Sequence, residues 1–165
     1  MSTSVALKDS TRLFNVLDAQ HEDWIVERAM EIVERRMFRG GQALQNSCAT
    51  MDFLRTRLAQ EPNEVFVALF MDNQNRVIAY EELFKGTVNS TSVYPRVVLS
   101  RVLAHNAAAI IFAHNHPSGL TDPSTADKFI TTRLKVVLEA VDVRVLDHVI
   151  VGQGPPFSFA EKGLL

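Results

Sequence analysis

The amino-acid sequence predicts an α/β fold in which helices cover the faces of a mixed β-sheet. The nearly continuous apolar run AAAIIFAHN, at residues 107–115, is typical of a central strand covered on both faces. An apolar run rich in β-forming residues at 65–72 is followed by a turn and a partner strand, which indicates a hairpin. A further strand at 144–152 follows a segment of helical periodicity. A chain of 165 residues fits one compact domain of this kind.

The first part of the chain is predicted to be helical. Residues 1–20 show only weak patterning, and we interpret them as a lead-in. A helix begins at about Asp23, where apolar residues recur at helical spacing between charged ones, and it ends at Gly40-Gly41. A second helix covers residues 47–60 and stops before Pro62.

The hairpin and the central strand follow. The two hairpin strands occupy residues 65–72 and 76–87, with Asn73-Gln74-Asn75 as the turn between them. Pro95 takes the first position of the next helix, where its fixed backbone angle and missing N–H are well tolerated. The central strand at 107–115 comes after that helix.

The last part of the chain is a helix, a strand and a tail. The helix runs from about Pro123 to Val141, because apolar residues form a stripe along it, and Asp122 is its expected N-cap. Residues 144–152 form the last core strand, and residues 157–165 are expected to be a short tail. The resulting order is helix, helix, hairpin, helix, strand, helix, strand.

Composition and charge argue against several classes of protein. The formal net charge of −2 gives no support for a nucleic-acid-binding surface. Cys48 is the only cysteine, so no disulfide can form within the chain, and a reducing compartment is expected. No apolar run approaches the ~18 residues of a membrane span, and the N-terminus has no apolar signal core. We therefore expect a cytoplasmic protein that does not enter a membrane.

The segment AHNHPSGLTDPSTAD, at residues 113–127, carries the strongest chemical signal. Side chains at i and i+2 of a strand point to the same face, so His114 and His116 can both aim at one point. Ser124 and Asp127 lie three residues apart at the start of the following helix and share a face. Two imidazoles and one carboxylate match a catalytic zinc site, which keeps its fourth position for water. A hydroxyl beside that position could donate a hydrogen bond to an oxyanion.

A metal site is not the only interpretation of this segment. An H-x-H pair alone is weak evidence for a metal, and Ser124 with Asp127 also forms a generic capping box. Two observations favour the metal. Polar residues that follow a buried strand lie where α/β folds place their sites. In addition, Asp122 as the N-cap would leave Ser124 and Asp127 without a capping role.

The chain resembles a known family. The pattern H-x-H-P-x6-S-x2-D is similar to the motif of the JAMM (MPN-plus) zinc metallopeptidases, and it is formed here by His114, His116, Pro117, Ser124 and Asp127. Longer segments of the sequence on both sides of this motif resemble the RadC-like (UPF0758) branch of that superfamily. The segments that carry this resemblance are EVFVALFMDNQNRVIAYEELFKGTVNSTSVYPR, AHNHPSG, RVLDHVIVG and FSFAEKGLL.

The resemblance implies a fold and a domain organisation. Residues 45–165 are expected to form a RadC-like MPN domain, a three-layer α-β-α sandwich with a mixed sheet, similar to the cytidine-deaminase-like fold. Residues 1–44 are expected to be an N-terminal lead-in and helix. They lack a convincing helix-hairpin-helix region of the kind found in full-length RadC proteins, so the chain resembles a short form of the family.

The resemblance also implies roles for the site residues. It implies a zinc ion (Zn2+) held by His114, His116 and Asp127, with Ser124 supporting the oxyanion. In the family pattern a glutamate that acts as general base lies before the first core strand. Glu64 occupies that position in this chain.

Three further polar residues stay open as candidates. Glu82 is the second candidate for the base, because adjacent residues of a strand face opposite sides and either Glu81 or Glu82 could point inward. His148 could be an outer hydrogen-bond partner of a ligating histidine, and a satisfied core histidine is the alternative. Asp147, beside it in the same strand, belongs to the same polar pair.

These observations lead to one preferred function and two alternatives. The preferred function is a zinc-dependent hydrolase that cleaves a peptide or isopeptide bond in a peptide or protein substrate. The first alternative is a nucleic-acid-associated DNA-repair accessory protein, for which the sequence offers little. The second is a non-catalytic MPN scaffold, which has no need of the complete set of site residues. The oligomeric state stays open.

Overall fold

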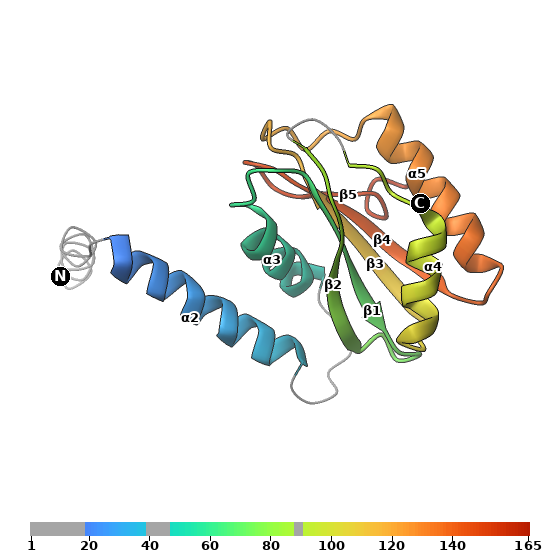
Figure 1. The fold of residues 1–165 in the computed structure, drawn as a ribbon, viewed down its shortest axis with the longest axis horizontal. Helices are drawn as coiled ribbons and strands as arrows, with labels where there is room; N and C mark the ends of the chain where they lie inside the picture. The colour runs from blue at the N-terminus through green and yellow to red at the C-terminus, as the bar shows by residue number, and fades with distance from the viewer. Residues whose placement is uncertain (1–18, 39–46, 88–90) are drawn as a thin grey trace, which may run out of the picture. The chain divides into compact units, whose positions relative to one another are not determined.

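A computed structural model describes residues 19–38, 47–87 and 91–165 (Figure 1). The chain divides into two units, Met1–Arg36 and Met37–Leu165. Helix α2 (Ala19–Phe38) begins four residues earlier than the predicted Asp23. The predictions for residues 1–18 and for Gly40-Gly41 lie outside the described residues. Over the described part of the chain, no helix has both the length and the apolar character needed to cross a membrane.

One mixed sheet lies at the centre of the second unit. Among the described residues its strand order is β2-β1-β3-β4-β5. Strand β1 pairs antiparallel with both β2 and β3, β3 and β4 run parallel, and β5 is antiparallel to β4. The strands are β1 (Val65–Met71), β2 (Val77–Lys85), β3 (Ala109–Asn115), β4 (Arg144–Val151) and β5 (Phe157–Ser158). The predicted mixed sheet is confirmed.

The C-terminal segment was predicted as a tail, and that prediction is wrong. Phe157 and Ser158 form β5, which pairs with Ile150 and Val149 of β4. The next residue, Phe159, is completely buried. A strand of two residues is too short to show an alternating pattern, so periodicity could not reveal it.

Helices cover both faces of the sheet. Helix α3 (Ser47–Leu58) lies on one face, and α4 (Pro95–Ala104) and α5 (Thr125–Glu139) lie side by side on the other (Figure 1). The arrangement is a three-layer α-β-α sandwich, as expected. Pro95 occupies the first turn of α4, as predicted. Every residue of β1 and of β3 is buried, which confirms that β3 is a central strand.

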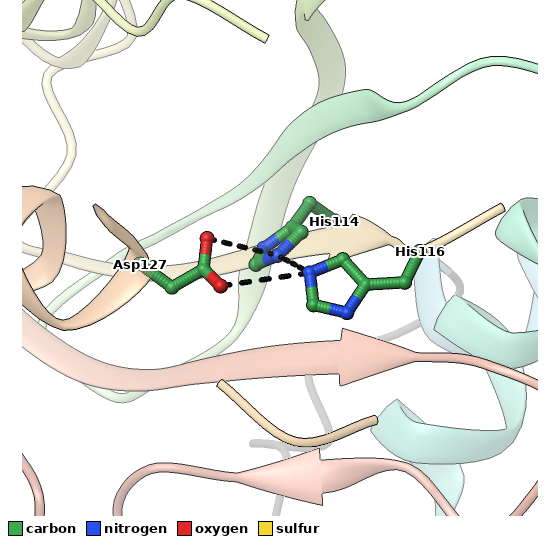
Figure 2. A group of neighbouring side chains, drawn as sticks. All are labelled: His114, His116 and Asp127. Atoms are coloured by element: carbon green, nitrogen blue, oxygen red, sulfur yellow. Dashed lines mark hydrogen bonds and ion pairs between the residues drawn. The ribbon is translucent and has the colours of Figure 1, made fainter. Parts of the chain in front are cut away.

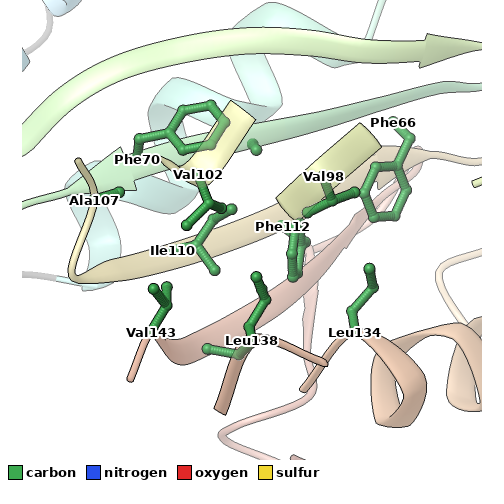
Figure 3. Close-up of a cluster of buried hydrophobic side chains, with 12 residues drawn as sticks. Phe66, Phe70, Val98, Val102, Ala107, Ile110, Phe112, Leu134, Leu138 and Val143 are labelled. Carbon is green, nitrogen blue, oxygen red and sulfur yellow. The ribbon is translucent and has the colours of Figure 1, made fainter. Parts of the chain in front are cut away.

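The main core fills the space between the sheet and the α4/α5 layer (Figure 3). Alternate residues of β3, Ile110 and Phe112, point into it. His114 follows Phe112 at the same spacing, so its ring lies at the edge of this core, stacked on Phe66 with centroids 6.1 Å apart. The other fully buried members of the core are Ala68, Phe70, Val98, Val102, Leu134 and Leu138.

The start of α5 differs from the prediction. The helix begins at Thr125 rather than Pro123, and Ser124 rather than Asp122 is its N-cap. The Ser124 hydroxyl accepts the Asp127 N–H at 3.1 Å, and the Asp127 carboxylate accepts the Ser124 N–H at 2.7 Å. This reciprocal box satisfies two backbone donors where a single cap would satisfy one. The interpretation that Ser124 and Asp127 have no capping role is therefore wrong.

Asn115 fastens the segment that leads into β1. Its side chain points away from the face that carries His114, and only 3% of the residue is exposed. The amide oxygen accepts the Val65 N–H at 2.8 Å, and the amide nitrogen donates to the carbonyls of Glu61 and Asn63 at 3.1 and 3.0 Å. The end of β3 thereby holds the chain immediately around Glu64.

Glu81 links β2 to α4. Its carboxylate accepts two hydrogen bonds from Arg101, one of them from Nε at 2.7 Å, and it contacts Nε2 of His105 at 2.6 Å. Hydrogen bonds from Arg101 lower the pKa of Glu81 from 4.5 to about 2, and His105 contributes in the same direction. The Glu81 side chain therefore lies on the α4 side of the sheet, where it is paired with Arg101 and His105.

We predict that Asn115→Ala lowers the free energy of unfolding by roughly 2–3 kcal/mol, because one N–H and two carbonyl groups lose their buried partner. Denaturant unfolding measures this change. Asn73→Ala, at an exposed turn position, is the control and should change the free energy by less than about 0.5 kcal/mol. Equal losses in the two variants would show that the Asn115 amide does not fasten this segment.

We also predict that Glu81→Gln destabilises the fold near neutral pH but not in acid. A carboxylate with a lowered pKa in the folded state stabilises the fold above its unfolded pKa, and that stabilisation disappears as the pH falls through the folded pKa. The variant should be less stable than the wild type by up to about 1 kcal/mol near neutral pH. The difference should shrink between pH 4.5 and about 2. A difference independent of pH over this range would contradict the assignment.

Candidate metal centre

Three predicted ligands converge at one end of the sheet (Figure 2). His114 lies near the end of β3, His116 in the turn that follows, and Asp127 in the first turn of α5. The Nε2 atoms of the two histidines are 3.0 Å apart. The Asp127 carboxylate faces both, with Oδ1 at 3.4 Å from His114 Nε2 and Oδ2 at 3.5 Å from His116 Nε2.

The backbone explains why the two histidines point the same way. The His116 N–H donates to the Val151 carbonyl at 2.9 Å, so the pairing of β3 with β4 continues one residue beyond the strand. His116 thus keeps the strand alternation, and its side chain shares a face with His114. The convergence predicted from the H-x-H spacing is present.

A backbone carbonyl sets the tautomer of His116. Its Nδ1 lies 2.8 Å from the carbonyl oxygen of Leu120. A carbonyl oxygen can only accept a hydrogen bond, so Nδ1 carries the proton. In the neutral ring, Nε2 then presents a lone pair toward Asp127 and His114. This is the state in which an imidazole binds a metal.

The turn between the two ligand-bearing elements is closely packed. Gly119 has φ +83°, a conformation that strongly favours glycine. A Cβ added to Gly152 would lie 2.4 Å from the Gly119 carbonyl oxygen. The Gln153 N–H donates to that same oxygen at 3.0 Å. The start of the segment after β4 therefore holds the turn that follows His116.

The helix cap orients the carboxylate. Asp127 Oδ2 accepts the Ser124 backbone N–H at 2.7 Å and the Ser124 hydroxyl at 2.6 Å. A carboxylate has about four lone-pair directions, so these two bonds leave capacity for other contacts. Capping and facing the histidines are therefore simultaneous roles of Asp127.

The spacing of the ligand atoms suits a tetrahedral ion. Zinc binds imidazole nitrogen and carboxylate oxygen at about 2.0–2.2 Å, which places the ligand atoms of a tetrahedron about 3.3 Å apart. The separations of 3.0, 3.4 and 3.5 Å lie close to this value, although the two distances to Asp127 are measured from different oxygens of its carboxylate. One ligand atom from each of the three residues lies within 4.8 Å of the other two. Two imidazole nitrogens and the two oxygens of one carboxylate face one another, and a cation among them would offset the negative charge of the carboxylate. His114, His116 and Asp127 thus fit a divalent metal such as zinc.

Burial and pairing favour the protonation states that a metal ligand needs at His114 and Asp127. Burial lowers the pKa of His114 to about 4, an effect that the charge of Asp127 partly opposes. Burial raises the pKa of Asp127, but hydrogen bonds from His116 and Ser124 and the charge of His114 outweigh it, so the pKa is well below its usual range. Asp127 raises the pKa of His116 by stabilising the charged ring, so a metal that binds at His116 Nε2 would have to displace a proton from it. At neutral pH, His114 is therefore an uncharged imidazole and Asp127 a carboxylate.

Glu64 lies in the same cavity as the three ligands. The cavity has a volume of about 490 Å³, and Ser124 also lines it. Burial raises the pKa of Glu64, and Asp127 adds to the rise, whereas His116 and a hydrogen bond from Thr91 oppose it. Most of the other lining residues are apolar, namely Phe66, Val93, Pro117, Ala126, Phe129 and Ile130, and the remaining ones are Thr91, Ser118 and Arg133.

Two other predicted candidates lie away from the cavity. Glu82 is exposed and pairs across the sheet with Val67, on the opposite face from Phe66. Asp147 accepts hydrogen bonds from the Ser158 hydroxyl at 2.6 Å and from the Ala160 N–H at 2.9 Å. Asp147 therefore holds the C-terminal turn.

His148 contacts His114 on the side of the ring that faces away from the other two candidate ligands. Its Nε2 lies 2.9 Å from Nδ1 of His114, and the residue is completely buried. The prediction of an outer hydrogen-bond partner therefore corresponds to a direct contact. Two residues that also support the site were missed in the sequence, Asn115 and Thr131. The signal for Asn115 was its place between two candidate ligands, because alternation directs its side chain to the other face.

Comparisons with known proteins place the chain in a family. The family model described as the RadC-like JAB domain matches residues 44–164. A UPF0758 protein of Halorhodospira halophila is 51% identical over 143 residues, which cover 85% of this chain and 64% of that protein. A UPF0758 protein of Nitrosococcus oceani is 58% identical over 125 residues, covering 76% of this chain and 56% of that protein.

A third relative matches over more of its own length. The UPF0758 protein of Vibrio cholerae is 52% identical over 145 residues, which cover 88% of this chain and 90% of that protein. Against the first two relatives, the chain spans a little over half to just under two thirds of their length. The JAB domain is related to the JAMM hydrolases, which agrees with the arrangement of the candidate ligands. The chain belongs to the RadC-like JAB domain family.

Proposed function

We propose that this chain is a zinc-dependent hydrolase that cleaves a peptide or isopeptide bond. The observation that carries the proposal is the shared cavity, in which Glu64 lies with His114, His116 and Asp127. A carboxylate that can move a proton and a three-residue site that suits zinc are the two parts that metal-assisted hydrolysis requires. His114, His116 and Asp127 would hold the ion, which when bound supplies a Lewis acid and lowers the pKa of water to roughly 7.

Glu64 is the proposed general base. As a carboxylate it accepts the proton of the attacking water, and as a carboxylic acid it returns that proton to the leaving nitrogen. Burial raises its pKa and so brings it closer to the pH at which both steps proceed. Hydrogen bonds between Glu64 and Thr87 and between Glu64 and Gly86 fix its backbone at the entry to β1.

Ser124 is the proposed donor to the substrate oxyanion. Its hydroxyl has a single hydrogen, which is directed at Asp127 Oδ2 at 2.6 Å. Donation to a substrate oxygen therefore requires the hydroxyl to rotate away from Asp127. The carboxylate keeps the Ser124 backbone N–H as a partner during that rotation, so the ligand stays oriented.

The walls of the cavity support a peptide or protein as the substrate. Phe66, Val93, Phe129 and Ile130 offer apolar surface for side chains. Arg133 is the cation among the described lining residues, and it lies six residues beyond Asp127 on the same helix. An extended chain that crosses this cavity would contact the apolar wall while its carbonyl lies near Ser124.

We predict about one zinc ion per chain in protein purified without chelators. His114→Ala and Asp127→Asn should each reduce the bound zinc by more than tenfold, because each removes one of three protein ligands. Lys128→Ala, at an exposed position next to Asp127, should bind zinc like the wild type. Elemental analysis after gel filtration measures these contents. Wild-type protein that takes up no zinc would contradict the metal assignment.

We predict that Glu64→Gln lowers hydrolysis by a factor of about 10²–10⁴ while zinc binding is kept, because the amide cannot accept the proton. Cleavage of a complex peptide mixture, followed by mass spectrometry, provides the measurement when the substrate is unknown. Glu82→Gln is the matched control and should cleave like the wild type, since Glu82 lies on the opposite face. Full activity in Glu64→Gln would exclude Glu64 as the base.

A further inference from the structure

The proposed reaction does not use His148, yet this ring is completely buried beside the site. Phe66, Phe112 and Phe159 surround it, with ring centroids 5.4, 6.2 and 5.0 Å away. A buried imidazole is costly unless both ring nitrogens have hydrogen-bond partners. The two partners of His148 are Nδ1 of His114 at 2.9 Å and the hydroxyl of Thr131 at 2.6 Å.

Which atom donates in each of these hydrogen bonds follows from the contact between Thr131 and the backbone of Asp127. The Thr131 hydroxyl lies 2.6 Å from the backbone carbonyl oxygen of Asp127. A carbonyl oxygen cannot donate, so the one hydrogen of the hydroxyl must point at Asp127. The hydroxyl oxygen is then an acceptor toward His148, and Nδ1 of His148 must carry the proton. In the neutral ring, Nε2 of His148 therefore presents a lone pair to His114.

The same logic sets the tautomer of His114. Its Nδ1 faces a lone pair of His148 at 2.9 Å, so Nδ1 is the donor. The lone pair of the neutral His114 ring is then on Nε2, the atom that faces His116 and Asp127. Burial of both rings disfavours their charged forms, which keeps the two imidazoles neutral.

We propose that His148 and Thr131 are positioning residues that hold His114 in its metal-binding tautomer and join it to the helix that carries Asp127. The inference rests on the proposed function, because it concerns ligands of the proposed zinc. The hydrogen-bond circuit begins at one ligand, His114, crosses β4 through His148, and ends at the backbone of another ligand, Asp127. It therefore joins β3, β4 and α5 directly behind the site.

The Thr131 hydroxyl determines which ring nitrogens of His148 and His114 carry a proton, so Thr131 is the residue to substitute. Thr131→Val keeps the shape of the side chain but removes the hydroxyl, whereas Thr131→Ser keeps the hydroxyl. We expect Thr131→Val to weaken zinc binding by a factor of about 10–100, the usual effect of losing an outer hydrogen-bond partner. Thr131→Ser should bind within a few-fold of the wild type. Competition with a chromophoric chelator measures both affinities.

A second variant tests whether the two residues act as one unit. His148→Phe fills the aromatic surroundings but leaves Nδ1 of His114 without an acceptor, so it should weaken zinc binding to a similar extent. The double variant with Thr131→Val should be little weaker than His148→Phe alone, because residues of one network do not act additively. Fully additive losses would overturn the proposed circuit, as would wild-type affinity in Thr131→Val.

The ¹⁵N chemical shifts of the histidine rings provide a test that does not depend on zinc binding or on activity. In metal-free wild-type protein, His114 should show the Nδ1–H tautomer, and Thr131→Val should shift it toward a mixture. A merely structural role for Thr131 would leave the tautomer unchanged. Detection of the Nε2–H tautomer in the wild type would overturn the inference. Wild-type protein that shows the Nδ1–H tautomer but binds no zinc would refute the proposed function and leave the circuit standing.

Discussion

The alternation of side chains at the end of β3 is the constraint on which the site depends. His114 and His116 face the cavity, and Asn115 between them faces the opposite layer. The same three residues thus supply two candidate metal ligands and fasten the segment that contains Glu64. A shift of β3 by one residue against its neighbours would exchange these roles completely. The pairing of β3 with β1 and β4 therefore fixes the positions of the two candidate ligands relative to Glu64.

The sequence predicted the structure best where side chains follow a regular repeat. The buried central strand and the convergence of His114 with His116 both follow from the two-residue repeat of a strand. The position of Glu64 came from resemblance to a family, because nothing in the local pattern distinguishes it from other glutamates. Thr131 and Asn115 were missed because their partners are distant in sequence. Val65 lies 50 residues from Asn115, and His148 lies 17 from Thr131.

The start of α5 shows why two correct observations led to a wrong choice. Asp122 before Pro123 is a good helix start, and Ser124 with Asp127 is a capping box. The helix uses the box, because it satisfies two backbone donors at once. Capping the helix and facing the histidines are not mutually exclusive for Asp127. One carboxylate has enough lone pairs for both, and the capping bonds keep its oxygens directed at the histidines.

Each of the three candidate ligands is oriented by a hydrogen bond from the protein itself. Leu120 holds His116, Ser124 holds Asp127, and His148 holds His114. In zinc fingers, by contrast, the ion organises its own ligands, and most of its binding energy is consumed in folding the chain. Here a metal would find its ligands already in place, so little of its affinity is lost to ordering. The metal-free chain would then remain folded, and a bound ion would add to its stability without being required for the fold, so the supply of the ion would control the proposed hydrolysis rather than folding.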